Sequence, residues 1–270
     1  MALTIQDLNA RLADTFKWAS EQLPTEAKQN IVNKLAERKN FKNIMFPFDK
    51  MPGFELKGYV FDSTISNPPK MTTKDGKVFY PSDIKFTVSQ DCYRNAALLV
   101  YSSVKAWEIK NGRTADKNNL TELFGNRLPV SVKQRVDQDG NPAEGVWVNV
   151  SLSVVTNAVG DMDFQNVKLA SEVEGKTIDV RTADGLLKPT DSQRAYVSIK
   201  PSVHMTGKGV IATRCSSLTL IPAPQKEESM SVDDLLGMGG EPTVASTAPT
   251  APAQPEEFQS ADDIISMIEI

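Results

Sequence analysis

Basic and aromatic side chains alternate with apolar ones in several short segments of this sequence. In residues 146–154 every even-numbered position is valine or leucine, whereas the odd-numbered positions hold Trp147, Asn149, Ser151 and Ser153. Alternate residues of a β-strand point to opposite faces, so this pattern predicts a strand with one apolar face and one open face that carries Trp147. Binding chemistry is expected on that open face.

The segment before it has the same alternation, with lysine and arginine where the other segment has tryptophan. Leu128, Val130 and Val132 share one parity, and Lys133 and Arg135 share the other. The intervening run Asp-Gly-Asn-Pro at 139–142 is a turn signal. We expect a hairpin whose buried face forces both bases and Trp147 onto the same open side.

Other predicted strands carry bases and rings at their non-core positions, and the loop of residues 67–80 adds more. The candidate nucleic-acid-binding residues are Lys57, Tyr59, Phe61, Lys70, Lys74, Lys77, Tyr80, Lys85, Lys133, Arg135, Trp147, Arg194, Tyr196 and Lys200. Exposed rings stack on unpaired bases at about 1–3 kcal/mol each, while lysine and arginine neutralise phosphates. The pattern therefore favours single-stranded nucleic acid, since no basic helix of the duplex-reading kind stands out.

Residue types needed for catalysis are scarce. His204 is the only histidine, and Cys92 and Cys215 are the only cysteines, so histidine metal sites, catalytic triads and CxxC knuckles lack their residues. Asp161 and Asp163 are the remaining candidates for a magnesium-dependent nuclease, but no other acids cluster with them. We expect a protein that is not an enzyme and that uses neither cofactor nor metal.

Helical segments flank and interrupt the strands. Residues 1–40 have the spacing of two amphipathic helices, the second starting at Pro24-Thr25, and a third helix is predicted from Asp91 to near Gly112. The expected fold class is α+β and rich in β: a helical preface at 1–40, a β-rich binding domain at 54–222 with one inserted helix, and a disordered tail at 223–270.

The tail is strongly acidic, although the whole chain has a net charge of only −4. Residues 223–270 hold ten acids and one base, a net −9, which leaves the body with 29 bases, 24 acids and a net +5. A basic body can neutralise phosphates, and an acidic tail can compete for the same surface or bind basic partners.

Two copies of one short motif lie in this tail, separated by a Pro-, Ala- and Thr-rich linker at 241–257. They are SVDDLLGM at 231–238 and SADDIISM at 260–267. In each, the serine can cap a short helix, the two aspartates favour its N-terminus, and the aliphatics form an apolar face that suits a partner's groove. The candidate partner-binding residues are Asp233, Asp234, Leu235, Leu236, Asp262, Asp263, Ile264, Ile265, Ile268 and Ile270.

A β-rich domain with basic and aromatic strand faces, then a Pro-rich linker and the acidic end DDIISMIEI at 262–270, resembles replicative single-stranded DNA-binding proteins, above all those of bacteriophages such as the schitovirus group. The resemblance implies an OB-like antiparallel barrel that coats single strands, and an acidic tip that recruits replication, recombination or transcription proteins. The chain departs from that class in two ways, because it ends in Ile270 rather than an aromatic residue and carries its motif twice.

The functional expectation is a non-enzymatic single-stranded DNA-binding protein of phage replication and recombination, with an effect on transcription through the tail. The alternative is a structural or assembly adaptor whose tail motifs tether partner proteins. No stretch approaches the roughly 20 apolar residues of a membrane span, and the N-terminal segment does not have the pattern of a secretory signal. We expect a cytoplasmic protein, in the host cytoplasm if viral; oligomeric state and DNA-versus-RNA preference are left open.

Overall fold

The structure is a computed structural model that describes residues 4–65, 69–72, 74–76, 78–79, 81–125, 127–136, 139–154, 195–221 and 223–224. Its helices are α1 (Ile5–Gln22), α2 (Thr25–Glu37), α3 (Tyr93–Asn111) and α4 (Thr121–Phe124), with short 3-10 turns η1 (Phe48–Lys50) and η2 (Gln90–Cys92). Its strands are β1 (Leu56–Ser63), β2 (Met71–Thr72), β3 (Val78–Phe79), β4 (Ser82–Val88), β5 (Val130–Val136), β6 (Pro142–Val154), β7 (Tyr196–Met205) and β8 (Ile211–Leu220).

Local sequence signals explain where the helices begin and end. The Thr4 side chain accepts a hydrogen bond from the Asp7 amide, and the Asp7 carboxylate accepts one from the Thr4 amide, which together form a capping box at the start of α1. Pro24 precedes α2, and Gly112 ends α3 with a φ of 66°. The predicted helical pair and inserted helix are confirmed, whereas the short α4 was not predicted.

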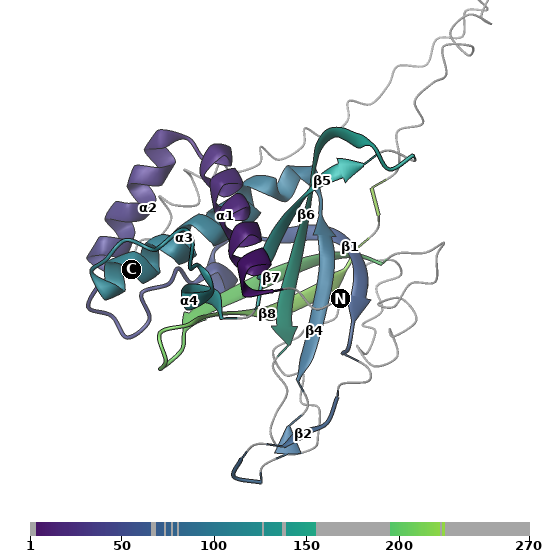
Figure 1. Cartoon of the computed structure of the whole chain (residues 1–270). Helices are drawn as coiled ribbons and strands as arrows, with labels where there is room; N and C mark the ends of the chain where they lie inside the picture. Colours follow the sequence, from purple (N-terminus) through teal and green to yellow (C-terminus); the bar gives the residue numbers. More distant parts are fainter. Residues whose placement is uncertain are drawn as a thin grey trace, which may run out of the picture. The chain divides into compact units, whose positions relative to one another are not determined.

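Five strands close into a ring. The sheet has the order β4-β1-β7-β8-β6-β5, and an additional pairing of β4 with β6 closes the ring, leaving β5 outside it on β6 (Figure 1). The predicted β5–β6 hairpin is confirmed, with Val132 opposite Val148. The expectation of an antiparallel sheet is wrong in one place, because β6 and β8 run parallel at Ser153–Arg214 and Val154–Cys215.

The ring and the helices share one hydrophobic core. Inward residues of the strands, among them Phe86, Val150 and Leu218, belong to the same buried cluster as Ile31 of α2 and Leu99 of α3. Helices α1, α2 and α3 lie together on one side of the ring (Figure 1). The face of the ring away from this core is therefore left to polar, basic and aromatic side chains.

Hydrogen bonds join the helices to the strands and to the turn between β7 and β8. The Thr15 hydroxyl of α1 accepts from the Val132 amide of β5 at 3.3 Å, and Trp107 Nε1 of α3 donates to the Gly209 carbonyl in the β7–β8 turn at 3.1 Å. Across the described residues, no helix combines the length and apolar character that crossing a lipid bilayer requires.

Candidate nucleic-acid interface

Strand register places outward side chains of five strands in one continuous row. Tyr196 of β7 lies opposite Tyr59 of β1, Tyr59 opposite Thr87 of β4, Thr87 opposite Asn149 of β6, and Asn149 opposite Ser131 of β5. The Thr87 hydroxyl donates to Asn149 Oδ1 at 2.8 Å. The row therefore has a tyrosine pair at one end, small polar groups in its middle, and the β5–β6 hairpin at its other end.

The hairpin end combines the most accessible indole with two bases. Trp147 is 43% exposed and lies opposite Lys133, which is also exposed. The Arg135 guanidinium lies 4.8 Å from the centre of the Trp147 ring, within cation–π range. A Cβ at Gly145, whose φ is 91°, would lie 3.3 Å from Arg135 Cδ, so the glycine leaves room for the arginine to lie across the strand.

Helices α1 and α3 support this hairpin from beneath. Tyr93 Oη of α3 donates to the Val146 carbonyl at 2.8 Å, and Trp18 of α1 meets the Tyr93 ring edge-on with 5.9 Å between centroids. Burial raises the pKa of Tyr93, against a smaller lowering by the nearby Arg135. Trp147 thus lies in a strand whose backbone is hydrogen-bonded to a side chain of α3.

The tyrosine end is more enclosed than the sequence indicated. Tyr59 and Tyr196 pack with centroids 4.8 Å apart, and the Tyr196 and Ser89 hydroxyls are hydrogen-bonded at 2.8 Å. Tyr196 points outward as predicted but is only 8% exposed, and burial raises its pKa. Tyr59 is half-buried and is the ring of this pair that is more open to a base.

Two predicted phosphate-binding lysines are paired with acids that sequence reasoning missed. Lys57 Nζ lies 2.8 Å from Glu55, and Lys85 Nζ lies 2.6 Å from Asp62. A β-bulge between Val60 and Asp62 shifts the parity of β1, so that Asp62 lies opposite Lys85. Strict alternation placed Asp62 on the inner face, which is why this partner was not predicted.

Glu55 connects strands β1 and β7. It accepts hydrogen bonds from Lys57 and from the Ser198 hydroxyl, and Lys200 is close enough to act on it electrostatically. Burial alone would raise the pKa of Glu55, but the two hydrogen bonds and the positive charges outweigh it and hold the pKa below its ordinary value. The carboxylate stays charged and reduces the positive field of Lys57 and Lys200.

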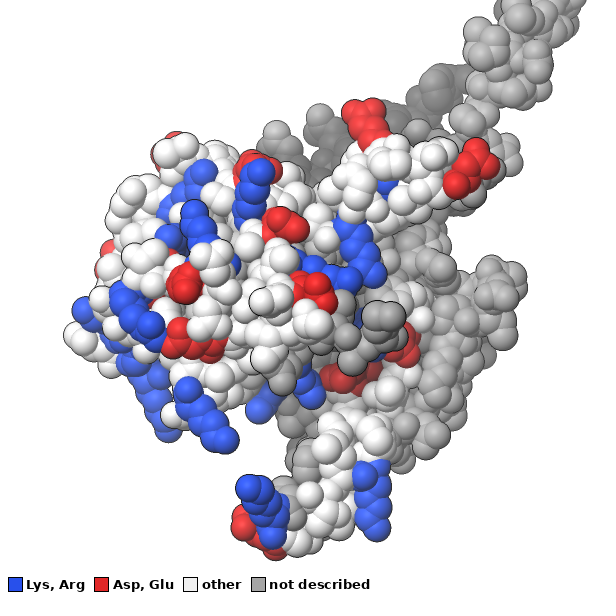
Figure 2. All heavy atoms as spheres, viewed as in Figure 1, with Lys and Arg blue, Asp and Glu red and all other residues white. Residues whose placement is uncertain are grey.

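The remaining predicted residues are spread more widely. Phe61 is 41% exposed at the bulge, and Lys70 and Lys74 are exposed before β2 and in the β2–β3 turn. Figure 2 shows lysine side chains projecting from the β2–β3 hairpin at the bottom of the view. On the rest of the visible face, lysine and arginine side chains are interspersed with acidic ones. Lys77, Tyr80 and Arg194 lie outside the described residues, as do all ten predicted partner-binding residues of the tail and the pair Asp161 and Asp163.

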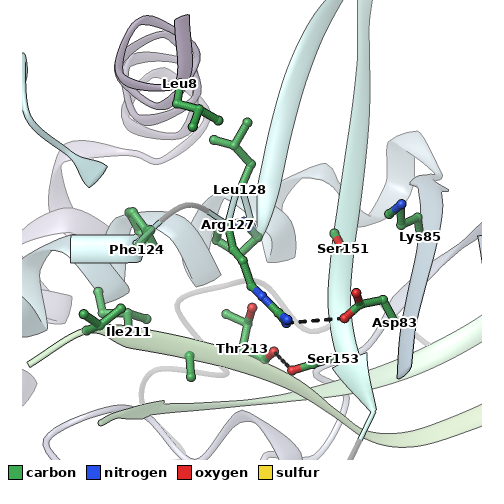
Figure 3. A pocket seen from close by; sticks show the side chains of 13 residues that line it. Leu8, Asp83, Lys85, Phe124, Arg127, Leu128, Ser151, Ser153, Ile211 and Thr213 are labelled. Carbon is green, nitrogen blue, oxygen red and sulfur yellow. Dashed lines mark hydrogen bonds and ion pairs between the residues drawn. The ribbon is translucent and has the colours of Figure 1, made fainter. Parts of the chain in front are cut away.

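A pocket of about 620 Å³, which the sequence did not indicate, adjoins the outward face. It lies beside β4, β6 and β8, and Arg127 Nη1 bonds to Asp83 Oδ1 across it at 3.4 Å (Figure 3). Lys85 and Ser151, which face one another across β4 and β6, belong both to the outward face and to the wall of the pocket.

The groups suited to nucleophilic or metal chemistry are enclosed or isolated. Burial raises the thiol pKa of Cys92 and of Cys215 to about 12, and burial together with Arg214 lowers the pKa of His204. No group of three or more histidine, cysteine, aspartate or glutamate side chains in the described part of the chain is placed to hold a metal ion.

Comparison with known proteins leaves the site to be interpreted from its own residues. No protein-family model matches this sequence, and no curated protein matches it.

Proposed function

We propose that this chain is a non-enzymatic protein that coats single-stranded DNA through the outward face of an OB-like barrel. A closed five-stranded ring is the framework such a barrel needs, and the ring of β1, β4, β6, β8 and β7 supports this assignment. The DNA would run along the row from Tyr59 toward the β5–β6 hairpin, with its bases against the rings.

The observation that carries the proposal is the environment of Trp147. An indole that is 43% exposed lies beside Lys133 and under the Arg135 guanidinium, on a strand anchored to α3. Large aromatic side chains are usually buried in the core. An exposed ring flanked by lysine and arginine therefore suits a ligand that has flat nucleobases and negative phosphates. The partner-recruiting role of the acidic tail, in replication, recombination or transcription, belongs to the same proposal.

The pairing of Lys57 with Glu55 and of Lys85 with Asp62 favours a second candidate. If the acids neutralise most of the face, the barrel is a structural adaptor and the tail motifs tether its partners. The two functions differ in one measurable property, because an adaptor has no salt-dependent affinity for single strands.

Fluorescence titration of the full chain with oligo-dT and with a duplex, at two salt concentrations, tests the proposal. Of the three tryptophans, Trp18 and Trp107 are 8% and 3% exposed, so quenching by the oligonucleotide should come mainly from Trp147. Trp147→Phe should abolish most of the quench yet retain binding measured by anisotropy, because a phenyl ring still stacks. Trp147→Ala should weaken binding by about 5- to 150-fold, which corresponds to the loss of one stacked base.

Lysine variants separate a specific face from general positive charge. Lys133→Ala should reduce the slope of log affinity against log salt by about 1, as expected for one lost phosphate contact. Lys39→Ala removes an exposed lysine of the helical side and should leave the slope unchanged. No binding of oligo-dT, or equal effects of both substitutions, would instead support the adaptor.

A further inference from the structure

The pocket beside β4, β6 and β8 exists because two neighbouring strands separate. Within the part of the chain that the structure describes, strands β6 and β8 pair at Ser153–Arg214 and Val154–Cys215. On the N-terminal side of that contact, β6 pairs with β5 and the segment before it instead, and the Ser151 amide donates to the Pro129 carbonyl at 2.9 Å. The space that opens between the two strands is bordered by α1, α4 and the segment of residues 127–129.

One wall of this pocket is polar and its opposite wall is apolar (Figure 3). The polar wall consists of strand residues with carboxylate, ammonium and hydroxyl groups. They are Asp83, Lys85, Ser151, Ser153 and Thr213. The apolar wall is formed by Leu8, Phe124, Leu128 and Ile211. Arg127 extends between the two walls, with a side chain that is 67% exposed.

Asp83 is a polar group of the pocket whose backbone is hydrogen-bonded to Thr64 on both sides. Its amide donates to Thr64 Oγ1 at 2.9 Å, and its carbonyl accepts from the Thr64 amide at 3.0 Å. Its Oδ1 accepts from Arg127, while its Oδ2 accepts no hydrogen bond from any other described residue. A fixed carboxylate with one oxygen available is an acceptor for a ligand with N–H donors.

We propose that this pocket binds one nucleotide, preferably guanine, either as part of the bound single strand or as a free nucleotide. The volume falls within the roughly 300–1,000 Å³ of small-molecule sites. The base would lie against the apolar wall, and the phosphate would lie near Arg127 and Lys85. For a nucleotide within a strand, the inference rests on the proposed function; for a free nucleotide it does not.

The chemistry of the base edges gives the preference. Guanine presents an N–H and an exocyclic amino group side by side, which match a carboxylate such as that of Asp83. Thymine presents a single N–H between two carbonyl oxygens, so a carboxylate that accepts from this N–H also meets a carbonyl oxygen that it repels. Because Lys85 and Ser151 belong to both the outward face and the pocket, a strand that stacks on the face reaches the pocket without leaving the protein surface.

The test compares oligo-dT with the same oligonucleotide carrying one central guanine, using the full chain and fluorescence anisotropy. Wild-type protein should bind the guanine-containing strand about tenfold more tightly, which lies within the range for discrimination of one base by direct hydrogen bonds. Asp83→Asn should remove this preference and leave affinity for oligo-dT within twofold, because the amide of asparagine replaces one acceptor oxygen with a donor. Asp49→Asn is the matched control in η1, away from the pocket lining, and should retain the preference.

A competition experiment, in which dGMP or dTMP displaces the oligonucleotide from wild-type protein, requires no variant and therefore does not depend on variant folding. Stronger competition by dGMP supports the site, whereas equal competition overturns it.

If both oligonucleotides bind alike and Asp83→Asn changes nothing, the pocket proposal is wrong while strand coating stands. If no oligonucleotide binds but dGMP binds in an Asp83-dependent manner, the pocket is a free-nucleotide site and the coating function fails. A guanine preference that survives Asp83→Asn places base reading elsewhere.

Discussion

Gly58 of β1 occupies a position where no side chain fits. A Cβ there would lie 2.1 Å from the Thr87 carbonyl oxygen of β4 and 2.9 Å from its carbon, both backbone atoms that cannot move independently of the sheet. Gly58→Ala should therefore lower the free energy of unfolding by about 3 kcal/mol, the upper part of the range for overpacking. Urea denaturation followed by circular dichroism measures this change.

Gly207, in the turn between β7 and β8, provides the control. Apart from the glycine and its two chain neighbours, no heavy atom of the described residues lies within 4 Å of a Cβ built on it. Gly207→Ala should therefore change stability by no more than about 0.5 kcal/mol, since the folded state accepts the methyl group and the unfolded chain loses some freedom. Equal effects at both positions would show that the β1–β4 contact is looser than described.

Individual side chains differ in how well the sequence predicted them. The exposure of Trp147 followed from alternation alone, because burial of the valines at the even positions of β6 places the odd positions on the open face. The pairing of Lys85 with Asp62 could not be predicted, since a bulge changes which residues of β1 share a face. Glu55 was missed for another reason: it precedes the strand, where alternation gives no information.

One buried hydroxyl forms a hydrogen bond between α1 and β5. Thr15 Oγ1 donates to the Arg11 carbonyl and accepts from the Val132 amide, with the threonine only 1% exposed. Thr15→Val keeps the shape but leaves the Val132 amide without its acceptor, which should cost about 1–3 kcal/mol of unfolding free energy. Thermal and urea denaturation test this. Thr114→Val, at an exposed threonine, should be nearly neutral.

The link between β1 and β7 should make stability depend on pH. The pKa of Glu55 is lower in the folded protein than its ordinary value of 4.5, so the unfolded chain binds a proton more readily. The contribution of Glu55 is present above about pH 4.5 and is lost as the pH falls from there through the lowered pKa. The wild-type protein should thus lose stability more steeply below pH 4.5 than Glu55→Gln does.

Urea midpoints measured between pH 3 and pH 7 check this dependence. Glu144→Gln, at an exposed acid of β6, should follow the wild-type curve. Parallel curves for Glu55→Gln and wild type would mean that the Lys57 and Ser198 contacts do not stabilise the charged form of Glu55.

Elements with local signals could be predicted, and elements made by distant contacts could not. The start of α2 after Pro24 and the end of α3 at Gly112 follow from cap chemistry within a few residues. The parallel pairing of β6 with β8 joins residues about 60 positions apart, and nothing near Ser153 or Arg214 specifies it. The pocket could not be predicted for the same reason, because it is a consequence of that pairing.

The division of charge between body and tail gives a prediction for the whole chain. A tail of net −9 competes with phosphates for a body of net +5, so removing residues 223–270 should tighten binding to oligo-dT and steepen its salt dependence. A full-length chain in which the tail aspartates and glutamates are replaced by asparagine and glutamine should behave like the truncated one. Unchanged affinity in both proteins would exclude competition by the tail.

Closure of the ring has a consequence for synthesis of the chain. Strand β1 pairs with β7, whose residues follow it by about 140 positions. At about 5–20 residues per second, a ribosome makes β7 roughly 7–28 s after it has made β1. During that interval the edge of β1 that pairs with β7 has unpaired backbone N–H and C=O groups, which can pair with another chain. A nascent chain of this protein should therefore be a chaperone client until its last two strands are made.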